Sequence, residues 1–175
     1  MEAFLMSSGI VAVAEIGDKT QLLSLLLAAR FRRPAPIVLG IFLATVANHF
    51  VAGATGAWVA SFFSAEVIRW ALGLSFLAIA GWALVPDEMD DDDAAIKPYS
   101  AFLATFVAFF LAEIGDKTQV ATVALAVKYH PLWAVVMGTT VGMMLANVPA
   151  VWLGDWISKR MEWLRRVRFV AAGIF

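Results

Sequence analysis

The chain has 175 residues, of which 62% are hydrophobic and 15% are charged, and its formal net charge is −1. A soluble domain is about half apolar and about a quarter charged, so this excess of apolar residues indicates a chain surrounded by lipid. The lack of a basic excess argues against nucleic-acid binding, and the lack of cysteine excludes disulfides, thiolate metal sites and cysteine nucleophiles.

The first half of the chain predicts three membrane-spanning helices, because about 20 consecutive apolar residues cross a bilayer as a helix. Residues 3–29 form the first apolar stretch, residues 37–63 the second and residues 67–85 the third. The N-terminus lacks the basic start of a signal peptide, so we interpret the first stretch as a mature span. Residues 1–86 are therefore the first three-helix repeat.

The second half predicts a similar set of helices after an aqueous connector. Residues 87–98 contain a block of acidic side chains, which is typical of a disordered segment; a loose antechamber that attracts cations is the alternative. Residues 99–127 and 132–157 predict the fourth and fifth spans. Residues 169–175 begin a sixth apolar run that is too short to span. Residues 99–175 are therefore a second three-helix repeat with an incomplete last span.

An internal repeat relates the two halves. The sequence AEIGDKTQ occupies Ala14–Gln21 and again Ala112–Gln119, at an offset of 98 residues. Weaker matches extend the repeat along a second helix: Gly40 and Gly138, Gly56 and Gly154, Trp58 and Trp156 and, one residue out of step, Asn48 and Asn147. An odd number of spans per half makes the second half enter the membrane from the opposite side. The sequence thus predicts an all-α integral membrane protein of two inverted three-helix repeats.

Basic residues in the connectors predict the orientation, because cytoplasmic loops are enriched in lysine and arginine. Nine basic residues follow the first, third and fifth spans: Arg30, Arg32, Arg33, Lys97, Lys159, Arg160, Arg165, Arg166 and Arg168. The connectors after the second and fourth spans contain only Arg69 and Lys128. This difference predicts that the N-terminus lies outside the cytoplasm.

Four carboxylates lie inside the predicted spans. Glu15 and Asp18 lie about halfway along the first span, and Glu113 and Asp116 lie about halfway along the fourth. A charge at mid-bilayer costs about 2.5–3.5 kcal/mol, so such residues usually face a cavity and mark an ion path. Glu and Asp three residues apart share one face of a helix. Two inverted copies would bring the four carboxylates together near the midplane as a metal site.

The neighbouring residues support this interpretation. Gly17 and Gly115 separate the carboxylates and allow close approach of the backbone or unwinding of the helix. Carboxylate and amide oxygens suit Mg²⁺, Ca²⁺ and Mn²⁺ better than Zn²⁺ or Cu⁺. Four amides could add neutral oxygens: Gln21, Gln119, Asn48 and Asn147. For the two asparagines, interhelical hydrogen bonding is the alternative.

A purely structural interpretation is that each motif forms its own salt bridge. Glu15 and Lys19 are four residues apart, as are Glu113 and Lys117, in the order that favours pairing on a helix. Such pairs would still leave the aspartate of each motif without a partner. His49 is interpreted as a packed histidine or one at the lipid interface.

The doubled pattern Glu-x-Gly-Asp-Lys/Arg-Thr/Ser, in two three-helix halves joined by an acidic loop, resembles the Gdt-one family of calcium/manganese antiporters. The resemblance implies transport of Mn²⁺ and, in eukaryotic members, Ca²⁺, in exchange for protons. It also implies a multi-pass protein of the bacterial inner membrane. The motif residues that it assigns to the site are Glu15, Gly17, Asp18, Lys19, Thr20, Glu113, Gly115, Asp116, Lys117 and Thr118. The shortened sixth span departs from the family pattern.

The leading hypothesis is a secondary transporter that exports Mn²⁺, which is neither an enzyme nor dependent on a cofactor. The alternatives are a Ca²⁺/H⁺ exchanger, a divalent cation channel whose carboxylates form a selectivity ring, and an intramembrane metal-dependent hydrolase. No nucleophile-and-base arrangement and no nucleotide-binding loop supports an enzyme or an ATP-driven pump. Four carboxylates and two lysines leave a charge of −2, which one divalent ion or two protons would neutralise.

Overall fold

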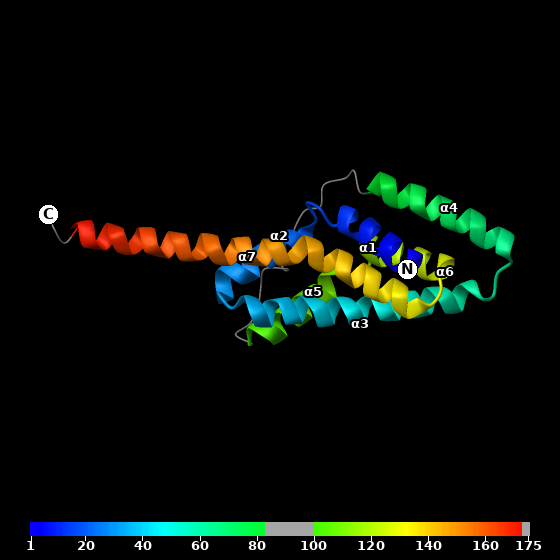
Figure 1. Cartoon of the computed structure of the whole chain (residues 1–175), viewed down its shortest axis with the longest axis horizontal. Helices are drawn as coiled ribbons and strands as arrows, with labels where there is room; N and C mark the ends of the chain where they lie inside the picture. Colours follow the sequence, from blue (N-terminus) through cyan, green and yellow to red (C-terminus); the bar gives the residue numbers. More distant parts are fainter. Residues whose placement is uncertain (83–99, 173–175) are drawn as a thin grey trace.

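The computed structural model describes residues 1–82 and 100–172, which form seven α-helices. In chain order these are α1 (Glu2–Ala14), α2 (Lys19–Phe31), α3 (Pro34–Ala60), α4 (Ala65–Trp82), α5 (Ala101–Ala112), α6 (Lys117–Lys128) and α7 (Leu132–Ala172). Figure 1 shows α4 on the outside of the bundle and the C-terminal part of α7 extending beyond the other helices. The acidic connector expected at residues 87–98 lies outside the described residues.

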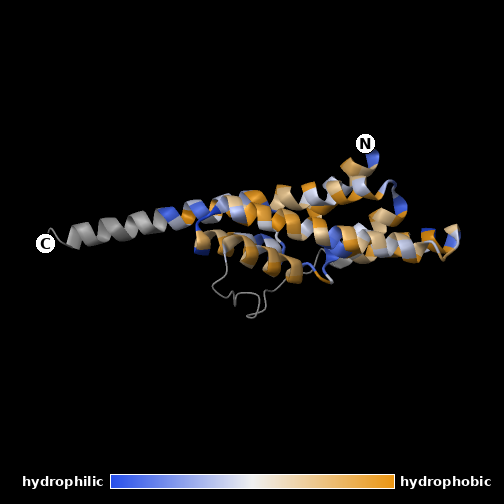
Figure 2. Cartoon of the chain, turned by 90° about the horizontal axis from the view of Figure 1, so that it is seen from below, coloured by the Kyte–Doolittle hydropathy of each residue, from blue (hydrophilic) through white to orange (hydrophobic). Residues whose placement is uncertain are grey.

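Two described helical segments are long and apolar enough to cross a membrane: Pro34–Ala60 and Leu132–Lys159. Large apolar side chains on these helices point outward, among them Phe50, Trp58 and Trp152. Figure 2 shows that hydrophobic residues make up much of every helix in the bundle. Exposed apolar surface of this kind is typical of a face that contacts a membrane or another protein, which is consistent with a membrane protein.

The first and fourth expected spans are each broken into two helices, α1 and α2 in the first half and α5 and α6 in the second. Both breaks contain a glycine, Gly17 or Gly115, with φ of 79°, a conformation that glycine adopts at little cost. The expectation that Glu15 and Asp18 share one face of a continuous helix is therefore wrong. Glu15 ends α1, and Asp18 precedes the first residue of α2.

The second and fifth expected spans are continuous, but α7 is longer than expected. We expected a basic connector after residue 157 and then the start of an incomplete sixth span, whereas α7 continues to Ala172. Residues 158–172 contain no glycine or proline, so nothing in their backbone chemistry interrupts the helix. Residues 169–172 of the expected sixth span belong to α7, and residues 173–175 lie outside the described part of the chain.

Each broken helix packs against the long helix of the other half: α1 and α2 contact α7, while α5 and α6 contact α3. Equivalent glycines allow these close approaches. A Cβ added at Gly138 in α7 would lie 2.5 Å from the carbonyl oxygen of Phe4 in α1. A Cβ added at Gly40 in α3 would lie 2.9 Å from that of Phe102 in α5. Gly138 lies 98 residues after Gly40, and Phe102 lies 98 residues after Phe4, so the two contacts are equivalent in the repeat.

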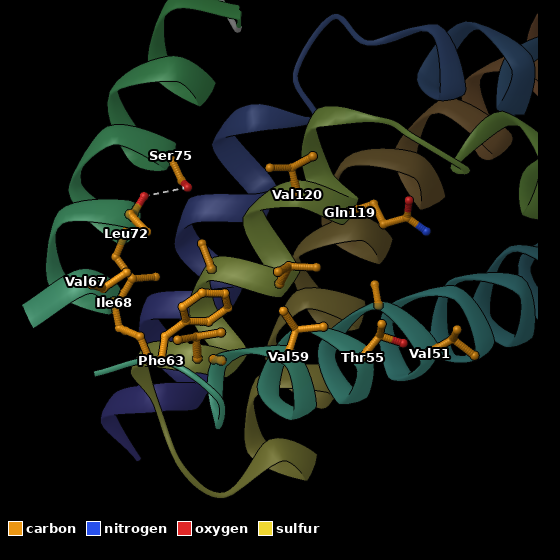
Figure 3. A pocket seen from close by; sticks show the side chains of 17 residues that line it. Val51, Thr55, Val59, Phe63, Val67, Ile68, Leu72, Ser75, Gln119 and Val120 are labelled. Atoms are coloured by element: carbon orange, nitrogen blue, oxygen red, sulfur yellow. Dashed lines mark hydrogen bonds between the residues drawn. The ribbon is translucent and has the colours of Figure 1, made fainter. Parts of the chain in front are cut away.

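An apolar cavity of about 630 Å³ lies between α3, α4 and α6. Val59, Phe63, Ile68 and Val120 are among its lining residues, and Figure 3 shows Gln119 at its edge. The motif carboxylates do not line it. Its walls offer few polar atoms that could bind a cation. The candidate ion site is therefore expected at the helix breaks, where the motif carboxylates lie.

The contact at Gly138 predicts a strong effect of one added methyl group. In Gly138→Ala the new Cβ would clash with the α1 backbone, and overpacking of this kind costs about 1–3 kcal/mol. We expect a lower melting temperature for the purified protein in detergent. Gly73→Ala in α4 is the control, because nothing lies within 4 Å of its added Cβ. Equal melting temperatures for the two variants would contradict this packing.

Candidate metal centre

Three carboxylates from the two motifs meet at the helix breaks. One ligand oxygen each from Glu15, Asp18 and Asp116 lies within 4.8 Å of the other two. Glu15 is fully buried, and each aspartate is 2% exposed. Glu15 is at the end of α1, and the aspartates are at the starts of α2 and α6. Residues 98 positions apart in the chain therefore contribute to one cluster, which we term the carboxylate cluster.

Glu113 was expected in the same group but is not among these three residues. It is fully buried, and its Oε2 accepts a hydrogen bond from Thr118 Oγ1 at 2.9 Å. Its Oε1 has no hydrogen-bond partner among the described residues. The two motifs have the same sequence, so the difference between Glu15 and Glu113 is produced by their surroundings.

The threonine of each motif holds the two carboxylates on either side of the break. Thr118 Oγ1 lies 2.9 Å from Glu113 Oε2 and 3.2 Å from Asp116 Oδ2. Thr20 makes the equivalent contacts with Glu15 and Asp18. Each aspartate also occupies the N-cap of a helix, where the exposed N–H groups and the helix dipole stabilise a negative charge.

Each motif lysine lies against the aspartate of the other motif. Lys117 Nζ donates to Asp18 Oδ1, and both side chains are buried. Lys19 Nζ lies 3.8 Å from Asp116 Oδ1, and its side chain is 25% exposed. The alternative of Glu–Lys salt bridges on one continuous helix did not include these contacts between the two halves.

The motif glutamines brace the unwound backbone. Gln21 Oε1 accepts a hydrogen bond from the Gly17 N–H at 3.0 Å, and Gln119 Oε1 accepts one from the Gly115 N–H at 2.8 Å. Each bond satisfies a backbone donor that the helix break leaves without an intrahelical partner. The sequence suggested these amides as additional ligands, whereas their oxygens here bind the motif glycines.

The amide nitrogens of the same glutamines establish the register of the repeat. Gln21 Nε2 donates to the Ala146 carbonyl oxygen at 3.1 Å. Gln119 Nε2 donates to Asn48 Oδ1 at 2.7 Å. Asn48 therefore corresponds to Ala146, at the regular offset of 98. The out-of-step match of Asn48 with Asn147 does not hold in these contacts, and His49 is the counterpart of Asn147.

Asn147 contacts the carboxylate cluster directly. Its Nδ2 lies 3.4 Å from Glu15 Oε1, and its Oδ1 accepts a hydrogen bond from Ser24 Oγ at 2.7 Å. All three side chains are buried. Sequence reasoning did not identify Ser24. The sequence feature that could have identified Ser24 is its spacing of four residues from Thr20, which places both polar side chains on the same face of α2.

Asn48 and His49 form interhelical contacts away from this cluster. Asn48 Nδ2 donates to the Phe110 carbonyl oxygen at 2.9 Å. His49 is fully buried, and its Nδ1 lies 2.9 Å from Thr139 Oγ1. The contacts of Asn48 match the structural alternative considered for it, and His49 is a packed histidine.

The chain matches a protein family along nearly its whole length. The family model described as "Divalent cation/proton antiporter GDT1" matches residues 3–91 and 101–175. The chain belongs to this family. As a member of the GDT1 family, it is a membrane transporter of divalent cations and not an enzyme, and the resemblance seen in the doubled motif is confirmed.

Bacterial and plant relatives align over most of the chain. A Vibrio cholerae protein named "Putative manganese exporter" is 51% identical over 176 residues, which covers 100% of this chain and 87% of the relative. A GDT1-like protein of Synechocystis is 28% identical, covering 93% of this chain and 87% of the relative. GDT1-like protein 3 of Arabidopsis thaliana is 27% identical, covering 92% and 64%. No solved structure matches.

The position of Asn147 predicts a role in orienting Glu15. In Asn147→Leu the amide donor is lost at similar volume, and we expect Mn²⁺ affinity to fall by about tenfold, as for other groups that orient a metal ligand. Isothermal titration of the purified protein measures this change. Thr140→Val is the control, since Thr140 is buried on the same helix and its Oγ1 has no partner among the described residues. Equal affinities of both variants would contradict the role of Asn147.

Proposed function

We propose that this GDT1-family protein exports Mn²⁺ in exchange for protons, and that the ion binds at the carboxylate cluster. The single observation that carries the proposal is the convergence of Glu15, Asp18 and Asp116, all buried, at the two helix breaks. Buried carboxylates within a membrane protein are costly unless they bind cations or protons. A path for ions would explain why the protein keeps carboxylates at these costly positions.

The chemistry of the donors favours a hard divalent ion. The cluster consists of carboxylate oxygens, which suit Mn²⁺, Ca²⁺ and Mg²⁺. The amide of Asn147 contacts Glu15 and would hold it in place while the metal is bound. Among these ions we propose Mn²⁺ as the cargo, because the Vibrio cholerae relative that is 51% identical carries the name of a manganese exporter. A Ca²⁺/H⁺ exchanger remains the alternative with the same ligands.

Two inverted halves would give this site access to both sides of the membrane in turn. The proposal is supported by contacts that recur at the 98-residue offset, such as Gly138 with Phe4 and Gly40 with Phe102. Discontinuous helices at the interface of two repeats are a recurring design of ion-coupled transporters. Rocking of one half against the other would then carry the ion past the fixed carboxylates.

We also propose the orientation of the chain from its sequence. The excess of lysine and arginine after the first, third and fifth expected spans puts these segments in the cytoplasm and the N-terminus outside it. We place the protein in the inner membrane of a bacterium. An inward proton gradient across that membrane would drive outward movement of the metal.

Proton coupling follows from the charge of the site. Four buried carboxylates and two lysines carry −2 in total, which either one divalent ion or two protons would neutralise. Metal and protons would therefore compete for the same oxygens. Because the carboxylates interact, the protons belong to the group as a whole and not to one residue.

Removing the charge of either aspartate tests the site. Asp18→Asn and Asp116→Asn keep the shape of the side chain and lose one negative charge. We expect each variant to remain in the membrane and to lose Mn²⁺ transport in proteoliposomes. Asp155→Asn is the matched control, because Asp155 pairs with Lys159 on α7 outside the carboxylate cluster. Wild-type transport by either cluster variant would exclude the proposed site.

Competition between metal and protons predicts a pH-dependent affinity. We expect Mn²⁺ to bind more weakly at about pH 5.5 than at about pH 8, because protonated carboxylates are poor metal ligands. In vesicles, Mn²⁺ flux should move protons in the opposite direction, as a trapped pH dye would report. Affinity that does not change with pH, together with metal flux that moves no protons, would exclude exchange and favour the divalent cation channel.

A further inference from the structure

Lys117 occupies the place where a cation would be needed if no metal were bound. Its ammonium donates to Asp18, one of the three residues of the carboxylate cluster, although the two residues belong to different motifs. Lys117 is only 4% exposed. A lysine buried to this extent requires a counter-charge, and a buried carboxylate requires one as well.

The lysine of the first motif is placed differently. Lys19 Nζ lies 3.8 Å from Asp116 Oδ1, and its side chain is 25% exposed. At this distance and exposure, water screens the pair and weakens it. Lys117 is therefore the stronger counter-ion of the cluster, although both lysines occupy the same place in identical sequences.

A bound divalent ion and the Lys117 ammonium would compete for the same carboxylate. If a metal ion takes an Asp18 oxygen as a ligand, the ammonium would lie a few ångströms from a charge of +2. Repulsion at such distances is large in a medium of low dielectric constant. The ammonium would then have to move, and Glu113 in the same motif offers a buried acceptor, since its Oε1 has no hydrogen-bond partner among the described residues.

We propose that Lys117 is a tethered cation that alternates with the cargo at Asp18. It withdraws toward Glu113 when the metal ion binds, and it returns to Asp18 when the metal leaves. This inference rests on the proposed function of the carboxylate cluster. It assigns to the motif lysine the task of giving Asp18 a counter-charge while no metal is bound, so that the carrier can return without metal.

The test is Lys117→Gln, which removes the competing cation and keeps a polar side chain. We expect Mn²⁺ to bind at least about tenfold more tightly than to the wild type, because nothing has to be displaced. In proteoliposomes, exchange of radioactive Mn²⁺ for unlabelled Mn²⁺ should continue, since both directions use the loaded carrier. Net Mn²⁺ export should fall by at least about tenfold, since it requires return without metal.

Two further variants control for charge and folding. Lys159→Gln removes a lysine that is paired with Asp155 outside the cluster, and it should change neither affinity nor export. Lys117→Arg keeps the charge, so it should not tighten Mn²⁺ binding. If Lys117→Gln unfolds during purification, added Mn²⁺ should restore its melting temperature, because the ion replaces the missing charge. Failure of Mn²⁺ to stabilise the variant would contradict the proposal.

The outcomes separate this inference from the proposed function. If the wild type binds Mn²⁺ and Asp18→Asn abolishes binding, the cluster is the metal site. In that case, unchanged or weaker binding by a folded Lys117→Gln protein overturns only the role of Lys117. Loss of exchange together with net export would also overturn it, because the lysine would then be needed by the loaded carrier. If the wild type does not bind Mn²⁺, both proposals fail.

Discussion

Burial of several carboxylates at one place in a membrane transporter is the constraint on which the rest of this structure depends. Glu15, Asp18 and Asp116 lie within reach of one cation, and each is almost completely removed from solvent. Such a cluster persists only if hydrogen bonds, helix N-termini and counter-ions stabilise it. Threonine hydroxyls, one asparagine and two lysines provide these interactions, which explains why so many polar side chains lie in otherwise apolar helices.

The helix breaks make this arrangement possible. A continuous helix would satisfy its own backbone and present only side chains to an ion, whereas a break brings a helix start close to the end of the preceding helix. The glycine at each break adopts a positive φ, and a glutamine accepts the N–H that the break exposes. Each six-residue motif with its following glutamine therefore contains the carboxylates, the turn and the groups that brace the turn.

Packing across the halves brings the two breaks together. The broken helices of one half lie against the long helix of the other, and glycines in α3 and α7 let the backbones approach closely. The arrangement is not fully symmetric, however. Lys117 is buried against Asp18, while Lys19 remains partly exposed beside Asp116. Identical sequences thus occupy two different environments, and this difference is what a carrier with two access states would require.

The sequence alone determined that the chain is apolar enough for a membrane, that it repeats at an offset of 98 residues, and that paired carboxylates interrupt the first and fourth spans. These features follow from composition and local spacing. Only the tertiary structure decided that the lysines pair across the halves, that Asn147 contacts Glu15, and that Glu113 stays outside the three-residue cluster. Local spacing assumed an unbroken helix, and contacts between residues about 100 positions apart depend on how the helices pack.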